Sequence, residues 1–226
     1  MRTLVVAATS AEVAPVVSRL RHTADRDPRV TRYRLANHDV DLLISGVGMV
    51  ATAAWTSREL NRERYDVAFN LGVCGSFTRD IEPGTVVHVV SDRLAELGAE
   101  DGDAFLTIEA LKLLEEDEFP FQSGRLVNAA PPANPGLVDL RPVDGITVNT
   151  VHGNERSIAC VVERFRPDVE SMEGAGFMYA CLIQSVPFAQ VRAVSNVVER
   201  RNRNAWKLDV AIRELGTAAL RLLEAS

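Results

Sequence analysis

Residues 169–206 read VESMEGAGFMYACLIQSVPFAQVRAVSNVVERRNRNAW and decide the fold class of this chain. They place a Met-Glu-Gly-Ala turn (172–175) between a strand and a helix, followed by an apolar strand that ends in Ser195-Asn196. In open α/β sheets, ligands bind at the carboxyl ends of strands, where polar groups follow apolar ones. The stretch therefore predicts a strand–helix–strand unit with a ligand site at that edge.

The rest of the chain alternates short apolar runs with amphipathic stretches. We expect strands at 3–8, 40–45, 67–71, 85–90, 146–148 and 188–194, and helices at 11–21, 50–64, 155–165, 173–184 and 205–223. This alternation is typical of a largely parallel sheet covered by helices on both faces. Residues 95–141 are less regular, and we interpret them as a surface excursion from a single domain that spans 1–226.

Composition limits the classes of function. The 226 residues are 46% apolar, which is enough for a full core. The net charge of −6 argues against nucleic acid as a partner, because no basic field covers the chain. The first apolar run is too short for a signal peptide, and no stretch approaches the roughly 20 apolar residues that span a membrane. Three widely spaced cysteines without a C-x-x-C pattern favour free thiols in the cytoplasm.

The 169–206 stretch resembles the purine nucleoside phosphorylase and nucleosidase superfamily, in the branch of methylthioadenosine/S-adenosylhomocysteine nucleosidase. Its ending, Ser195-Asn196-x-x-x-Arg200-x-x-Arg203-x-x-Trp206, more narrowly resembles futalosine hydrolase. The resemblance covers residues 3–223 and is weakest over 95–141. It implies a three-layer α/β/α sandwich, phosphorylase/hydrolase-like, with a twisted mixed central sheet. It also implies a small-molecule nucleoside substrate, no cofactor, and a homo-oligomer (dimer or higher).

Two glutamates each have a structural and a functional interpretation. Thr9-x-x-Glu12 has the spacing of a capping box, which the spacing alone favours. In the resembled nucleosidases, a Glu after the first strand activates water, and the resemblance favours this role for Glu12. Glu173 begins a helix, where an acid stabilises the helix dipole. In the family, the Glu at this position binds the ribose 2′- and 3′-hydroxyls, and the preceding Met172 packs on the sugar.

The glycine-rich segments also carry candidate site residues. Gly46-x-Gly48-x-x-Ala51 mimics a dinucleotide fingerprint but lacks the acidic residue after the next strand, so we expect Gly48 to let the backbone approach a ligand. Cys74 has no histidine pattern to activate it as a nucleophile, which favours a buried thiol. Ser76 matches the family's Gly-x-x-Gly-Ser turn, whose hydroxyl helps to hold the attacking water.

Two polar residues occupy the last apolar strand. Arg192 needs a partner when buried, either in an internal ion pair or in the family's role beside Glu12 and the water. Asn196 stands where adenine-specific members have an Asp that protonates the purine N7. An amide donates one hydrogen bond and accepts another, which suits the O6 and N7 of a 6-oxopurine. We therefore expect a hypoxanthine-like base.

The cluster Arg200, Arg201 and Arg203 is basic in an acidic protein. A solvated helix start is the usual explanation of such a run. Futalosine, however, carries a benzoate, and guanidinium groups bind carboxylates in a bidentate fashion. We expect Arg203, with or without Arg200, to contact this group, Trp206 to form an aromatic wall, and Arg201 to be solvated.

The predicted reaction is hydrolysis of futalosine to hypoxanthine and dehypoxanthine futalosine, in menaquinone biosynthesis. No cluster of His, Cys and Asp has the spacing of a metal site. A phosphorolytic transferase would need an anion-binding segment after the first strand, where residues 8–11 are Ala-Thr-Ser-Ala instead. Asn196 disfavours a methylthioadenosine nucleosidase. A non-catalytic nucleoside-binding protein stays open.

Overall fold

The computed structural model describes residues 1–225. Its strands are β1 Arg2–Ala7, β2 Arg21–Asp27, β3 Val30–Leu35, β4 His38–Ile44, β5 Val67–Ser76, β6 Val86–Asp92, β7 Gly98–Asp101, β8 Ala104–Thr107, β9 Phe121–Gln122, β10 Arg125–Val127, β11 Arg141–Thr147, β12 Val169–Ser171 and β13 Phe188–Val197. Its helices are α1 Ser10–Val17, α2 Met49–Arg62, α3 Pro135–Val138, α4 Glu155–Phe165, α5 Gly174–Gln184 and α6 Leu208–Glu224, with a 3₁₀ turn at Arg203–Ala205.

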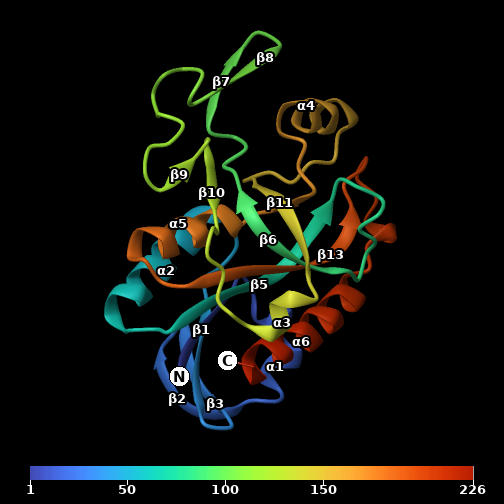
Figure 1. The fold of residues 1–226 in the computed structure, drawn as a ribbon. Helices are drawn as coiled ribbons and strands as arrows, with labels where there is room; N and C mark the ends of the chain where they lie inside the picture. Colours follow the sequence, from blue (N-terminus) through green and yellow to red (C-terminus); the bar gives the residue numbers. More distant parts are fainter. Residues whose placement is uncertain (226) are drawn as a thin grey trace.

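A mixed sheet of 11 strands forms the centre of the molecule (Figure 1). β1 pairs in parallel with both β4 and β5, and β5 pairs in parallel with β13. The sheet closes on itself beyond β5, because β12, β11, β6 and β13 follow one another and β13 returns to β5. The carboxyl ends of β5 and β13 therefore lie next to β12, which leads into the Met172–Glu173 turn.

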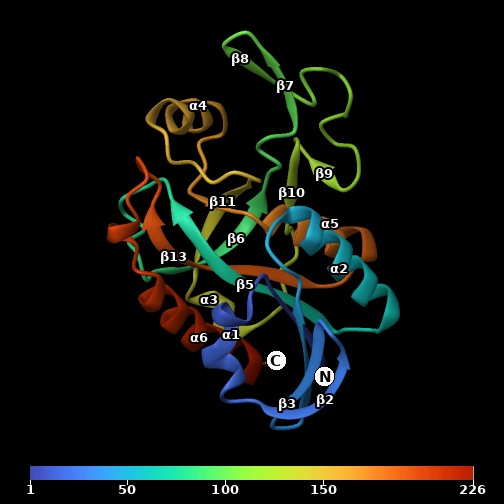
Figure 2. The same ribbon diagram turned by 180° about the vertical axis from the view of Figure 1, so that it is seen from behind.

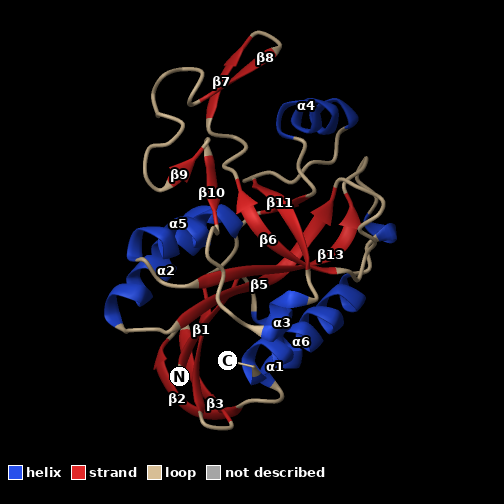
Figure 3. Ribbon diagram, viewed as in Figure 1, coloured by secondary structure: helices blue, strands red, loops and turns tan. Residues whose placement is uncertain are grey.

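Helices cover both faces of the sheet, as the alternating side chains of β1 require. Val5 and Ala7 point into a core shared with α1 and α6, whereas Leu4 and Val6 point into a core shared with α2 and α5. Figures 2 and 3 show these two helical layers on opposite sides of the strands. The predicted three-layer α/β/α sandwich with a mixed sheet is confirmed.

Several boundaries differ from the sequence-based expectation. The first helix ends at Val17, and residues 21–35 form the hairpin β2–β3, which we did not predict. β2 reads RHTADRD and is largely exposed, so it has no apolar alternation to mark it as a strand. The last helix begins at Leu208, because a 3₁₀ turn precedes it.

The excursion over residues 95–141 contains short strands. β7 and β8 form a separate two-stranded hairpin that projects from the molecule, and β10 extends the central sheet by pairing with β6 (Figure 1). The single domain expected for 1–226 stays a prediction, and residue 226 lies outside the described residues. Within residues 1–225, the structure has no helix with the length and apolar character needed to cross a bilayer.

Candidate functional site

Glu173 reaches across the molecule instead of capping its own helix. It is the N-cap residue of α5, but its side chain makes no cap hydrogen bond there. Its Oε1 accepts a hydrogen bond from the Gly48 amide at 3.1 Å, and Gly48 adopts φ +100°, a conformation that favours glycine. The carboxylate is 5% exposed. The dipole interpretation alone does not explain this geometry, which fixes the carboxylate beside the start of α2.

Arg192 provides the buried positive charge of the site. The side chain is 1% exposed and projects from β13. Its Nη1 lies 3.6 Å from Glu173 Oε2, and its Nη2 donates a hydrogen bond to Asn70 Oδ1 on β5. Buried arginine requires such partners, since an unpaired charge is costly to desolvate. The internal ion pair, one of the two alternatives that the sequence offered, is therefore present, and it joins Arg192 to the candidate ribose-binding residue.

The carboxylate of Glu12 makes contacts in two directions. Oε2 accepts hydrogen bonds of 2.9 Å from the Thr9 amide and the Thr9 hydroxyl, so the capping box forms. Oε1 turns the other way and accepts from the Val73 amide at 3.2 Å. A Cβ built on Gly72 would lie 3.0 Å from this oxygen and would also collide with Arg192 Nη1. Glu12 and Arg192 thus converge above the bare backbone of Gly72.

Asn196 lies at the end of β13, where its amide is held in one orientation. Ser195 Oγ lies 2.8 Å from Asn196 Oδ1 and 3.1 Å from the Cys74 carbonyl. Asn196 Nδ2 lies 3.0 Å from the Val197 carbonyl, and the residue is half-buried. Asn196 borders a cavity of about 440 Å³ that Arg79, Trp206 and Lys207 also line. An oriented amide at a cavity wall suits recognition of one donor and one acceptor.

Three other residues that the sequence pointed out, Met172, Ser76 and Cys74, each have a different environment. Met172 is half-buried at the turn before α5. The Ser76 hydroxyl is buried and donates to the Thr78 carbonyl at 2.7 Å, so in this structure it closes a local turn. Cys74 is buried, and burial raises the pKa of its thiol to about 12. A thiol with this pKa is not an activated nucleophile.

The arginine cluster lies apart from the buried cluster of Glu12, Glu173 and Arg192. Arg200 and Arg203 are exposed in the segment between β13 and α6. Arg201 is exposed as well, but its guanidinium carbon lies 5.6 Å from the centre of the Trp206 ring, a cation–π contact. Arg79 and Lys207, which the sequence did not single out, line the Asn196 cavity instead.

The sequence also left out polar residues that the strands bring to this edge. Asn70 and Glu170 are buried polar groups in apolar strands, which is the signal that pointed to Arg192. Glu170 accepts hydrogen bonds from the amide and the ring of His152, and no sequence pattern indicates that histidine. Asp92 is 1% exposed beneath the α5 turn, and burial raises its pKa to about 6, although hydrogen bonds from Gln190 and Thr147 oppose the rise.

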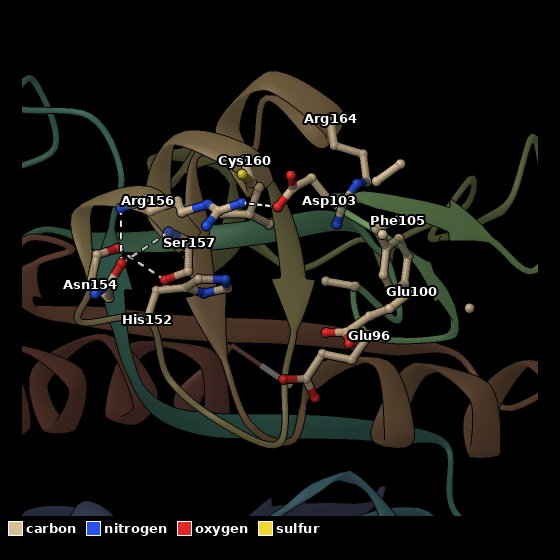
Figure 4. Close-up of a pocket in the computed structure, with 15 residues that line it drawn as sticks. Glu96, Glu100, Asp103, Phe105, His152, Asn154, Arg156, Ser157, Cys160 and Arg164 are labelled. Carbon is tan, nitrogen blue, oxygen red and sulfur yellow. Dashed lines mark hydrogen bonds and ion pairs between the residues drawn. The ribbon is translucent and has the colours of Figure 1, made fainter.

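A larger cavity, of about 700 Å³, lies between the β7–β8 hairpin and α4 (Figure 4). Its wall includes His152. Acidic side chains line it on the side of the hairpin, and basic side chains line it on the side of α4. It adjoins the strand ends without containing Glu12, Glu173 or Arg192, so we place the centre of the site at the buried cluster. Among residues 1–225, no group of three or more His, Cys, Asp and Glu side chains is arranged to hold a metal ion.

Comparison with known proteins places this chain in a family. The sequence model of the phosphorylase superfamily matches residues 2–225. The chain belongs to the phosphorylase superfamily. Within this superfamily, a futalosine hydrolase from Streptomyces coelicolor is 33% identical over 201 residues, which cover 86% of this chain and 83% of that protein. A futalosine hydrolase from Acidothermus cellulolyticus is 31% identical and covers 95% of this chain and 87% of its own length.

The fold is similar to that of a solved member of the superfamily. A 5′-methylthioadenosine/S-adenosylhomocysteine nucleosidase from Colwellia psychrerythraea, solved in complex with adenine, superposes with a TM-score of 0.80 and covers 100% of this chain and 95% of that one. The two sequences are 21% identical. This likeness establishes the shared fold of the superfamily, and the identity of the substrate rests on other observations.

Proposed function

We propose that this protein is a futalosine hydrolase, which uses water to cleave the N-glycosidic bond of futalosine and releases hypoxanthine. The observation that carries the proposal is the amide of Asn196, oriented by Ser195 at the end of β13, the strand that also carries Arg192. Relatives named futalosine hydrolase, 31–33% identical over most of the chain, support it. The products would enter menaquinone biosynthesis.

In this mechanism the ribose is held at the turn before α5. Glu173 accepts hydrogen bonds from the 2′- and 3′-hydroxyls, because an ionised carboxylate accepts at both oxygens. The Gly48 amide and Arg192 fix that carboxylate in place before the substrate arrives, which reduces the reorganisation needed in the transition state. Met172 packs against the sugar ring.

Water attacks from the side of Glu12. Its Oε1, next to the bare backbone of Gly72, takes a proton from the water that adds to the oxocarbenium-like anomeric carbon. The Thr9 contacts to Oε2 keep the carboxylate pointing toward this space. Ser76 contributes to the water site if its hydroxyl turns away from the Thr78 carbonyl, and Asn196 stabilises the charge on the departing base.

The benzoate of futalosine is anchored by positive charge in the segment that follows β13. Arg203, with or without Arg200, is the anchor proposed from the sequence, with Trp206 as the aromatic wall. The exposed position of both arginines requires this segment to fold over the substrate. Arg79 and Lys207 line the cavity at Asn196 and are the alternative cationic partners.

A second function, methylthioadenosine/S-adenosylhomocysteine nucleosidase, draws support from the fold of the Colwellia enzyme. Asn196 argues against it, because an amide has no proton to transfer to an adenine nitrogen. Phosphorolysis is disfavoured because Arg192 is already engaged by Glu173 and Asn70. Chromatography of reactions with futalosine, inosine and methylthioadenosine, with and without phosphate, separates all three functions. Binding of futalosine without turnover of any substrate would indicate a non-catalytic nucleoside-binding protein.

We also propose a cytoplasmic homo-oligomer that acts without nucleic acid or membrane partners. The free cysteines fit a reducing compartment. Side chains on α2 and α5, including Val50 at 76% and Ile183 at 41% exposure, leave apolar surface for a second copy. Light scattering on the purified protein measures the oligomeric state, and a monomeric mass would contradict this part of the proposal.

A further inference from the structure

His152, which is half-buried, pairs with the buried Glu170, and the mechanism above does not use this pair. Glu170 is 4% exposed on β12, and both of its oxygens are bound by one residue. The His152 amide donates to Oε1 at 3.0 Å, and the ring Nδ1 lies 2.6 Å from Oε2. Because an ionised carboxylate only accepts, Nδ1 carries the hydrogen. The other ring nitrogen, Nε2, has no hydrogen-bond partner among residues 1–225 and belongs to a side chain that lines the large cavity.

Strand pairing brings this pair beside Asn196. Gly75 on β5 pairs with Glu170 on one side and with Asn196 on the other. A Cβ built on Gly75 would lie 3.3 Å from Asn196 Nδ2 and 3.6 Å from Glu170 Cγ, so both side chains border the same bare backbone. The loop that contains His152 also contacts the segment that follows Asn196, since the Arg201 amide donates to the Gly153 carbonyl at 3.1 Å. The His152 loop is therefore a neighbour of the strand end that carries Asn196.

We propose that His152, oriented by Glu170, is the acid that protonates the departing base. This inference rests on the proposed nucleosidase function, in which Asn196 supplies hydrogen bonds but no proton. As the bond between the anomeric carbon and the base nitrogen breaks, its electron pair stays on the base, and the base takes the proton from Nε2. Water adds to the anomeric carbon and loses a proton to Glu12. Exchange with solvent then restores the protons of both residues.

A structural role alone would use only the side of the ring that faces Glu170. Histidine is suited to the further step because the charge of an imidazole changes near neutral pH. The ring packs edge-to-face on Phe77, with centroids 6.1 Å apart, which restricts its rotation. The other charged groups around this cavity are Glu96, Glu100, Asp103, Arg156 and Arg164, and Arg156 is paired with Asp103 (Figure 4).

The test compares kcat for futalosine, as a function of pH, in wild type, His152→Gln and Glu170→Gln. Wild-type kcat should decrease on the alkaline side as the imidazolium is lost. His152→Gln should lose at least about 100-fold in kcat together with that alkaline decrease, because general-acid catalysis is worth about 10²–10⁴. Glu170→Gln should lower kcat as well, because the NH₂ group of the new amide cannot accept from Nδ1 and the ring is no longer held in one orientation. His22→Gln removes a histidine from an exposed pair with Asp25 and is the matched control, with no change expected.

The outcomes separate this inference from the function on which it rests. Absence of futalosine hydrolysis in the wild type would reject the proposed function, and the inference with it. If the wild type is active, folded His152→Gln protein with unchanged kcat and an unchanged alkaline decrease would overturn the role of His152 alone. Circular dichroism identifies variants that fail to fold. In that case Glu170→Gln, which preserves the shape of the side chain, decides, because an unchanged kcat would overturn the role of His152.

Discussion

Asp92 should make the protein less stable as the pH rises, and the change Asp92→Asn should remove this dependence. The carboxyl is 1% exposed, and burial raises its pKa from 3.8 to about 6. The folded state therefore holds the proton more tightly than the unfolded state. The stabilisation is complete below pH 3.8 and is lost as the pH rises through about 6. The full difference is worth about 3 kcal/mol, of which about 1.4 kcal/mol falls between pH 5 and 8.

The substitution suits this site because the surrounding groups can accept an amide. Thr147 and the Arg93 amide both donate to Asp92 Oδ1, and an Asn oxygen can replace it. Gln190 donates to Oδ2 while its own Oε1 has no partner, so reversal of the Gln190 amide pairs that oxygen with the new NH₂ group. The variant then mimics the protonated state, with its new NH₂ group donating to the Gln190 oxygen.

Urea unfolding at pH 5, 6, 7 and 8 measures the effect as the free energy of unfolding of the variant minus that of the wild type. This difference should increase by about 1.4 kcal/mol over the range. Asp144→Asn is the control. Burial raises the pKa of Asp144, but hydrogen bonds from Ser91 and Arg125 outweigh this and lower it overall, so its difference should be constant above pH 5. A constant difference for Asp92→Asn would refute the argument.

Three further predictions concern the site. Glu12→Gln should lower kcat at least about 100-fold with little change in KM, measured by release of hypoxanthine, and near-normal turnover would leave Glu12 as a helix cap alone. Asn196→Asp should raise the ratio of kcat/KM for methylthioadenosine to that for futalosine by about tenfold or more, and an unchanged ratio would remove Asn196 from base recognition. Arg203→Ala should weaken futalosine binding by about 1.5–3 kcal/mol while inosine cleavage and an Arg201→Ala control stay unchanged, and equal loss for both substrates would indicate a structural role.

The sequence predicted the layers of the fold well because the buried strands carry apolar runs. The strands around β1, β5 and β13 are covered on both faces, and their residues show it. The β2–β3 hairpin was missed because β2 is exposed and polar, and its pairing with β3 is set by neighbours rather than by its own pattern. The closure of the sheet through β12 and β6 had no local signal either.

The candidate site could be predicted where one residue carries the signal. Arg192 in an apolar strand required a partner, and Glu173 is that partner. The sequence presented the two roles of Glu12 as alternatives, although its two oxygens point in different directions and allow both. Glu170 and Asn196 meet only because both flank Gly75, a relation that depends on strand register. The spacing of residues along the chain does not indicate neighbours of this kind, which are far apart in the sequence.

The central claim, hydrolysis of futalosine at the Glu12–Glu173–Arg192 site, is tested most directly by chromatography of a reaction in phosphate-free buffer. The purified protein should convert futalosine to hypoxanthine and dehypoxanthine futalosine at a rate that added phosphate does not change. Products that appear only with phosphate, together with a sugar 1-phosphate, would contradict the claim and make the protein a phosphorylase.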